Sequence, residues 1–228
     1  CVEKNIWLIS DEAYRNIYYT DNGPTSIWNI SNDIVPGIKG RRISIESVSK
    51  VWNACGLRIG ALVTDNEVMF DKVRSEYTAN LCANVIGQYI FGAVANLSNQ
   101  EIVDWYKAQR QYYSQVINRL IKGLKEELPG LIISRPKASI YIILDFSRIT
   151  PYNFKISDFI EYSAKYGKYK YKNKLYTLLL SPMNGFYSDK VSGSKLARIA
   201  LVETKNKMKV VPSLLSKLLK DYLLINSS

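Results

Sequence analysis

The stretch RRISIESVSKVWNACGLRIG, residues 41–60, carries the strongest fold signal in this chain of 228 residues. Within residues 41–47 two isoleucines alternate with polar side chains, a pattern that predicts a strand. Lys50 follows directly after that strand, where α/β folds place their ligands. Ser47 precedes the lysine and Arg58 follows it closely. An amine, a hydroxyl and a guanidinium that meet at one place suit a phosphate-bearing aldehyde held as a Schiff base.

This signal is not specific by itself, because a lysine at a strand end is commonly a solvated surface residue. Two further segments add to it. Residues 6–10, IWLIS, predict a buried strand, which leads into DEAY at residues 11–14. Residues 197–201, ARIAL, predict a late strand that contains Arg198. The order of these segments along the chain is more informative than any one of them.

Taken together, these segments resemble the class I/II aminotransferases of fold type I, the aspartate aminotransferase superfamily, which use pyridoxal 5'-phosphate (PLP). Residues 77–80 and Gln88 are similar to the family's segment that leads into its long connecting helix. Residues 135–141, RPKASIY, are similar to its P-x-(G/A)-x-x-Y strand, and residues 181–187, SPMNGFY, to its P-G-x-x-F segment. The resemblance runs from about residue 5 to the C-terminus.

The resemblance implies an α/β fold that is the C-terminal part of a fold-type I PLP-dependent transferase. A remnant of the large-domain mixed sheet would lie in residues 1–97, the connecting helix in 98–130, and the α+β small domain in 131–228. Family members are much longer, and their N-terminal phosphate-binding turn and ring-stacking residue have no counterpart in this sequence. We therefore expect the C-terminal half of an aminotransferase, with the missing N-terminal half and a homodimer partner as its protein partners.

The resemblance also implies roles at the cofactor. Lys50 would bind PLP covalently and then carry a proton, a task that needs an accessible neutral amine. Asp11 would keep the pyridine nitrogen protonated, as a partly buried acid, and Tyr14 would donate a hydrogen bond to the 3'-oxygen. Read without the family, Asp11 is a turn former and Tyr14 an ordinary packing residue.

The remaining candidates would bind phosphate and substrate. Ser47 and Arg58 would hold the phosphate, the arginine through a bidentate contact, with Ser49 as a weaker candidate. Arg198 would bind the substrate α-carboxylate, although an arginine in a strand is usually a surface salt-bridge residue. The implied substrates are an amino acid, small or acidic, and a 2-oxo acid.

Composition narrows the class of protein. With 47% hydrophobic and 22% charged residues the chain is globular. No apolar run approaches the roughly 18–20 residues of a membrane span, so we expect no membrane contact. Cys1, Cys55 and Cys82 are few and scattered, which favours a reducing compartment and a cytoplasmic protein. The chain has no histidine, so we expect no zinc site.

The formal net charge of +11 is partly explained by residues 165–174, KYGKYKYKNK. Lysines interleaved with tyrosines suit nucleic-acid binding. The alternative, which we favour, is an exposed lysine-rich hairpin that resists edge-to-edge pairing. Three interpretations of the chain therefore remain: part of a PLP-dependent aminotransferase, a truncated and catalytically inactive aminotransferase fragment, and a basic nucleic-acid-binding module. We expect the first.

Hydrophobic periodicity places the other elements. We expect strands over 57–64, 140–144 and 177–180. The resemblance implies that the first of these runs antiparallel to the strand at 41–47. We expect helices over 67–76, 84–97 (buried), 98–128, 157–166 and 213–224. The sheet of the large-domain remnant would have unpaired edges, so we expect the chain to pair with its missing half, to self-associate, or to rearrange locally.

Overall fold

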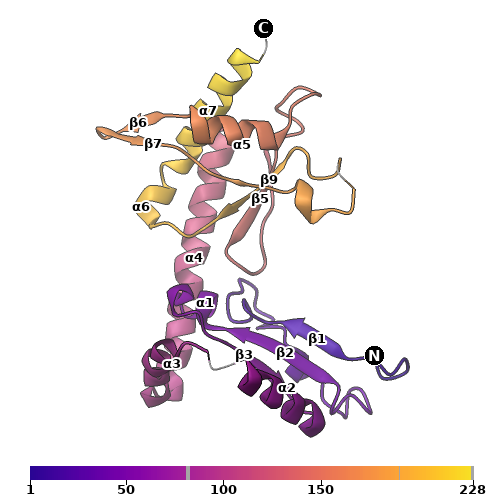
Figure 1. Cartoon of the computed structure of the whole chain (residues 1–228). Coiled ribbons are helices and arrows are strands. Elements are labelled where there is room, and N and C mark those ends of the chain that lie inside the picture. The colour runs from indigo at the N-terminus through magenta and orange to yellow at the C-terminus, as the bar shows by residue number, and fades with distance from the viewer. Residues whose placement is uncertain (81–82, 190, 227–228) are drawn as a thin grey trace. The chain divides into compact units, whose positions relative to one another are not determined.

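A computed structural model describes residues 1–80, 83–189 and 191–226. The chain forms two compact units, residues 1–110 and 111–228 (Figure 1). Within the described residues no helix has both the length and the apolar composition needed to cross a membrane.

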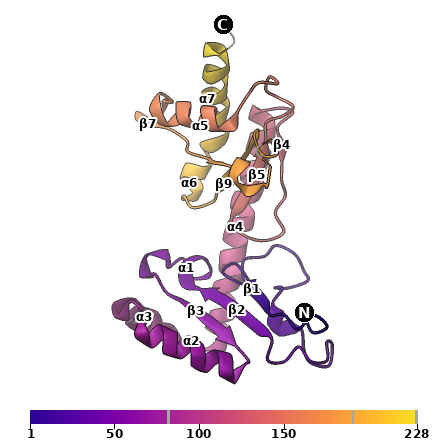
Figure 2. The same ribbon diagram turned by 45° about the vertical axis from the view of Figure 1, so that its right-hand side comes forward.

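The first unit contains a three-stranded sheet in the order β1 (Leu8–Asp11), β2 (Arg42–Ser47) and β3 (Gly60–Thr64), which Figure 2 shows side by side. β1 and β2 are parallel, and β3 runs antiparallel to β2. All three predicted strands are confirmed, including the direction of the third. Because β1 and β2 are parallel neighbours, their carboxyl ends meet at one edge of the sheet.

One face of this sheet is apolar and partly exposed: Ile43 is buried, at 6% exposure, but its apolar neighbours on that face are open to solvent. The register pairs Ile9 with Ile43 and Ile45 with Leu62, so these side chains point to the same side. Ile9 is 64% exposed, Ile45 38% and Leu62 41%. On the opposite face Ser44 is fully buried. The first face therefore has apolar side chains that no described segment of the chain covers.

Short helices and 3-10 turns connect and follow the strands of the first unit. The one-turn helix α1 (Val48–Val51) comes directly after β2. The helix predicted over 67–76 is confirmed as α2 (Glu67–Ala79), which begins at the side-chain N-cap of Asn66. α3 (Val85–Gly92) is followed by the 3-10 turn η3 (Ala93–Asn96). Two further 3-10 turns are η1 (Ile27–Asn29) and η2 (Cys55–Leu57).

The predicted burial of the helix over 84–97 is wrong. The helix exists, but Gly87 is its one buried residue, while Ile86 is 73% and Tyr89 86% exposed. Apolar composition predicts that a helix will be covered, but it does not say by what. No described segment of this chain forms a layer over the exposed side of α3.

The long helix α4 (Asn99–Glu127) runs from the first unit into the second. Its start is a capping box in which the Ser98 hydroxyl accepts from the Glu101 N–H and the Glu101 carboxylate accepts from the Ser98 N–H at 2.7 Å. The predicted helix is confirmed, and it ends just before Pro129 and Gly130, where the chain turns.

The second unit contains a four-stranded antiparallel sheet in the order β4 (Ile132–Ile133), β5 (Tyr141–Asp145), β9 (Leu196–Ala200) and β8 (Ser181–Pro182). Its helices are α5 (Ile156–Lys165), α6 (Lys205–Met208) and α7 (Val211–Ile225), with the 3-10 turn η4 (Asn184–Phe186). The core comes from alternate strand residues and the apolar sides of the helices, and it includes Leu120, Leu124, Ile142, Leu144, Phe146, Phe159 and Leu215.

Two predictions for the second unit have different outcomes. The strand predicted over 177–180 is wrong, because these residues connect β7 to β8 without forming a strand. The basic tract forms a hairpin of β6 (Tyr169–Tyr171) and β7 (Lys174–Tyr176), which confirms the hairpin interpretation. Lys172 and Asn173 make its turn with φ of 46° and 61°, the positive values that a type I′ turn requires.

Candidate functional site

The lysine turn, residues 47–52, lies at the carboxyl edge of the first sheet. Lys50 belongs to α1 and is half-buried. Ser47 ends β2 and caps α1, since its hydroxyl accepts from the Ser49 N–H at 3.1 Å. Ser47 is therefore held in place by the local structure, and its O–H is left to donate to a ligand.

Asp11 ends β1, the parallel neighbour of β2, so it lies at the same sheet edge as the lysine turn. Its carboxylate accepts from the Ala13 N–H at 3.1 Å, which makes it a turn former as well. We expected a partly buried acid, but Asp11 is exposed, because it points to the same face as Ile9 and Ile45, which are exposed as well. Tyr14 is half-buried in the turn that follows, and its carbonyl accepts from the Ile17 N–H.

Arg58 lies in the loop between η2 and β3. The register pairs Ser47 with Gly60, and the Val48 N–H donates to the Ile59 carbonyl, so this loop runs beside the start of α1. Arg58 has a left-handed backbone, with φ of 56°, and is exposed. Its Nη1 donates to the Cys55 carbonyl at 2.9 Å, which fixes part of the guanidinium.

Arg198 belongs to β9 in the second unit. Its guanidinium lies 4.3 Å from the ring centre of Tyr141 and 5.0 Å from that of Phe186. These two aromatic residues come from the segments that resemble the family's P-x-(G/A)-x-x-Y and P-G-x-x-F patterns. Two aromatic faces hold an arginine by cation–π attraction without neutralising its charge. The described residues give Arg198 no ion pair.

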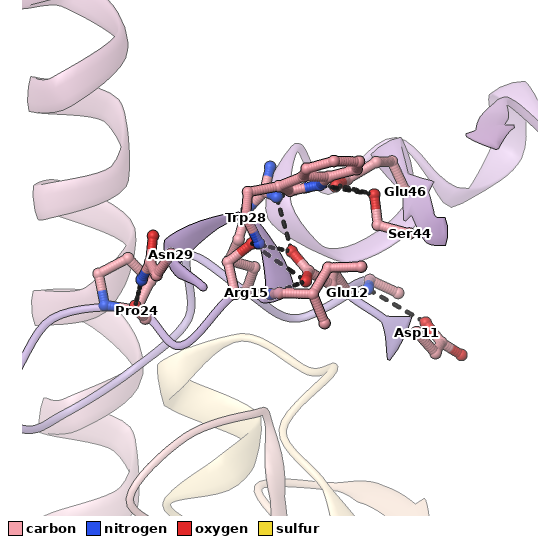
Figure 3. A network of polar contacts seen from close by, with 11 residues as sticks. Asp11, Glu12, Arg15, Pro24, Trp28, Asn29, Ser44 and Glu46 are labelled. Atoms are coloured by element: carbon pink, nitrogen blue, oxygen red, sulfur yellow. Dashed lines mark hydrogen bonds and ion pairs between the residues drawn. The ribbon is translucent and has the colours of Figure 1, made fainter. Parts of the chain in front are cut away.

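The most connected polar group in the first unit is a cluster around Glu12, which the sequence reasoning missed (Figure 3). The Glu12 side chain is 2% exposed and accepts from the Ser26 hydroxyl at 2.7 Å and the Ile27 N–H at 2.8 Å. Arg15 Nη1 lies 2.7 Å from Glu12 and 2.8 Å from Glu46, so one guanidinium bridges two carboxylates.

The Glu12 cluster continues through Ser44. The Trp28 indole N–H donates to the Ser44 hydroxyl at 3.0 Å, and that hydroxyl lies 3.0 Å from a Glu46 carboxylate oxygen. These contacts tie the loop around η1 to β2 and to the end of β1. The sequence does contain one indication of this cluster. Glu12 directly follows Asp11, so strand alternation points the Glu12 side chain to the opposite face of the sheet from Asp11.

The Glu12 carboxylate stays ionised in this environment. Burial acts to raise its pKa, but hydrogen bonds from the Ile27 N–H, the Ser26 hydroxyl and Arg15, with the positive charge of Arg15, outweigh that effect. The pKa of Glu12 therefore lies below its ordinary value of 4.5.

A cavity of about 190 Å³ lies between the Glu12 cluster and the lysine turn. Its lining includes Glu12, Arg15, Glu46 and Tyr106 on the polar side, and Val51 and Trp52 from the lysine turn. The described residues contain no group of three or more possible metal ligands. Cys1 and Cys55 are free and exposed, and Cys82 lies outside the described residues.

Comparison with known proteins identifies the family. Residues 1–205 match the family model described as aminotransferase class I and II. A probable aspartate/prephenate aminotransferase of Aquifex aeolicus is 27% identical over 168 residues, which cover 72% of this chain and 41% of that protein.

Solved structures agree on the fold. An α-aminoadipate aminotransferase of Thermus thermophilus superimposes with a TM-score of 0.75 at 17% identity, covering 98% of this chain and 52% of that one. A PLP-bound putative aminotransferase of Clostridium difficile gives 0.76 at 20% identity, covering 96% and 51%. The chain therefore spans about half the length of the structures it matches. The family match over most of the chain shows that this protein belongs to the class I and II aminotransferases.

Proposed function

We propose that this chain supplies the lysine side of the active site of a PLP-dependent aminotransferase, which moves an amino group between an amino acid and a 2-oxo acid. The observation that carries the proposal is the parallel pairing of β1 with β2. It brings Asp11 and the lysine turn to one sheet edge, in a protein of a family whose structural neighbours include PLP-bound enzymes.

The donor set fits PLP. An amine at 50, a carboxylate at 11, and a hydroxyl and a guanidinium at 47 and 58 match an aldehyde, a pyridine nitrogen and a phosphate. Bound PLP supplies a cationic ring that withdraws electrons from the substrate Cα. The Lys50 amine would hold the aldehyde and then move the proton between Cα and the cofactor.

The other residues bind and orient. Asp11 would hold a proton on the ring nitrogen by charge, and Tyr14 would donate its phenol hydrogen to the 3'-oxygen. The Ser47 hydroxyl and Arg58 would bind the phosphate. Arg198, kept unneutralised between its two rings, would bind the substrate α-carboxylate by a fork-to-fork contact.

We further propose the domain assignment of residues 1–97, 98–130 and 131–228, a cytoplasmic location, and partnership with an N-terminal half in a homodimer. The uncovered apolar face with Ile9, Ile45 and Leu62 supports a missing layer over the sheet. Alone, the chain would bind PLP weakly, because each lost charge-assisted hydrogen bond to phosphate removes about 1.5–3 kcal/mol.

A catalytically inactive fragment is the second candidate, and the exposure of Asp11 favours it. Absorbance spectra separate the two. PLP is added to the chain alone and to the chain mixed with an N-terminal aminotransferase half. We expect a visible band of the covalent lysine adduct in the mixture, fixed by borohydride and abolished in Lys50→Ala. A mixture without any band would contradict the proposed enzyme function.

The third function, nucleic-acid binding, has a test of its own. If the hairpin retained RNA with a steep dependence on salt concentration, that result would favour nucleic-acid binding over both other functions.

A further inference from the structure

Helix α4 holds the lysine turn through two side chains. The Trp105 indole Nε1 donates to the Val51 carbonyl at 3.0 Å, and Gln109 Nε2 donates to the Lys50 carbonyl at 3.2 Å. Trp105 and Gln109 are one helical turn apart, so they lie on the same face of α4. Two consecutive carbonyls of the lysine turn are therefore bound by one helix face within the first unit.

The lysine turn needs outside support. α1 has four residues, far fewer than the roughly 12–15 that an isolated helix needs to be even marginally stable in water. Trp52, at the end of the turn, packs against α3 and α4. Its ring lies 5.8 Å from that of Trp105, nearly parallel at 12°, and 5.8 Å from Phe91 edge-on. These contacts secure the turn by packing, and the two hydrogen bonds set its backbone.

Gln109 is an unexpected residue for this position. It is 6% exposed, and its Oε1 is the one buried side-chain polar atom without a hydrogen-bond partner among the described residues. An unsatisfied buried acceptor destabilises the folded state. A methionine has similar length and would bring no such penalty. The amide is therefore explained by its N–H donation to the Lys50 carbonyl rather than by packing.

We infer that Gln109 and Trp105 are positioning residues for Lys50. They act through its backbone: by holding the carbonyls of residues 50 and 51, they fix the point from which the lysine side chain starts. This inference rests on the proposed function of Lys50 as the residue that binds PLP. It assigns to α4 a direct effect on the geometry of the reacting amine.

The first test measures amide hydrogen exchange in Gln109→Met and in the matched control Gln111→Met, an exposed glutamine on the same helix. The reporter is the Asn53 N–H, which donates to the same Lys50 carbonyl. We expect its exchange to rise roughly fivefold to tenfold in Gln109→Met, as for the loss of one hydrogen bond, and not in the control. An unchanged rate, or an equal rise in both variants, overturns the inference.

A merely structural role for Gln109 would act on the whole unit. We expect the urea midpoint of Gln109→Met to be no lower than that of Gln111→Met, since the unsatisfied acceptor has been removed. A lower midpoint with faster exchange throughout residues 1–110 would mean that Gln109 stabilises the unit and does not specifically position Lys50.

The second test follows PLP itself. With the N-terminal half present, we expect Gln109→Met to form the covalent Lys50 adduct about fivefold more slowly, in line with a lost hydrogen bond, and to shift the midpoint of its absorbance against pH. Unchanged rate and midpoint overturn the inference. If the native chain forms no adduct, the proposed function fails, and the exchange at Asn53 still decides whether α4 holds the turn.

Discussion

Replacing Glu12 by glutamine tests the buried cluster directly. The amide oxygen can still accept from the Ile27 N–H, but the side chain can no longer carry the negative charge that faces Arg15 at 2.7 Å. A charge-assisted hydrogen bond is worth about 1.5–3 kcal/mol. Arg15 is 28% exposed and keeps Glu46, so we expect the lower end, about 1.5 kcal/mol.

The assay is urea unfolding followed by tryptophan fluorescence. Trp7, Trp28, Trp52 and Trp105 are the four tryptophans of the chain, and all lie within residues 1–110, so the signal reports on the first unit. With a slope of about 1–2 kcal/mol/M for a unit of this size, the midpoint should fall by about 1 M. The matched control is Glu3→Gln, because Glu3 is exposed.

The same variant has a pH signature. The folded-state pKa of Glu12 lies below 4.5, so its stabilisation is fully present above that pH and is lost as the pH falls through the folded pKa. The gap in unfolding free energy between native chain and variant should therefore close below pH 4.5. A gap that is no larger than that of Glu3→Gln at pH 7, or that stays constant into acid, would refute the reasoning.

Three further outcomes follow from particular contacts. Arg42 binds Asp65 through both Nε and Nη2, at 3.0 and 2.6 Å, so Arg42→Lys should destabilise the first unit by about 1–2 kcal/mol in the same fluorescence assay, and equal stability would contradict this. A Cβ at Gly167 would lie 2.7 Å from the Ser163 carbonyl oxygen, so Gly167→Ala should destabilise the second unit by about 1–3 kcal/mol, read from thermal unfolding by circular dichroism; an unchanged melting temperature would show that the turn relaxes. Arg198→Met, in the enzyme completed with an N-terminal half, should raise the KM for the amino acid at least tenfold while the PLP adduct still forms, and an unchanged KM would remove Arg198 from the substrate site.

Elements with a clear period were predictable from the sequence. The strand alternation at 41–47 correctly located β2, and the helical periodicity after residues 66 and 98 correctly located α2 and α4. The predicted strand at 177–180 failed because a short continuous apolar run has no period to distinguish strand from connection. The burial of α3 failed because it depends on a covering layer, which one segment's sequence does not specify.

The site was predictable only in part, for a related reason. Lys50 and Asp11 follow strands, and a parallel pairing brings strand ends together, so their shared edge could be inferred. The partners of Glu12 at Ser26 and Ile27 come from an irregular loop, whose path no periodicity encodes. The contact of Arg198 with the Tyr141 ring likewise depends on the register between β5 and β9. That register pairs Ile143 with Arg198 and so brings Tyr141, two residues away on β5, within reach.

The left-handed backbone at Arg58 bears on how this chain would respond to selection. A non-glycine residue at φ of 56° is strained by about 1 kcal/mol relative to glycine. Directed evolution for heat tolerance alone would therefore drift toward glycine at this position. Selection for growth on the product of transamination would retain the arginine, if its guanidinium binds phosphate. Sequencing codon 58 in the two evolved pools would show whether the arginine is kept for phosphate binding despite the backbone strain that it causes.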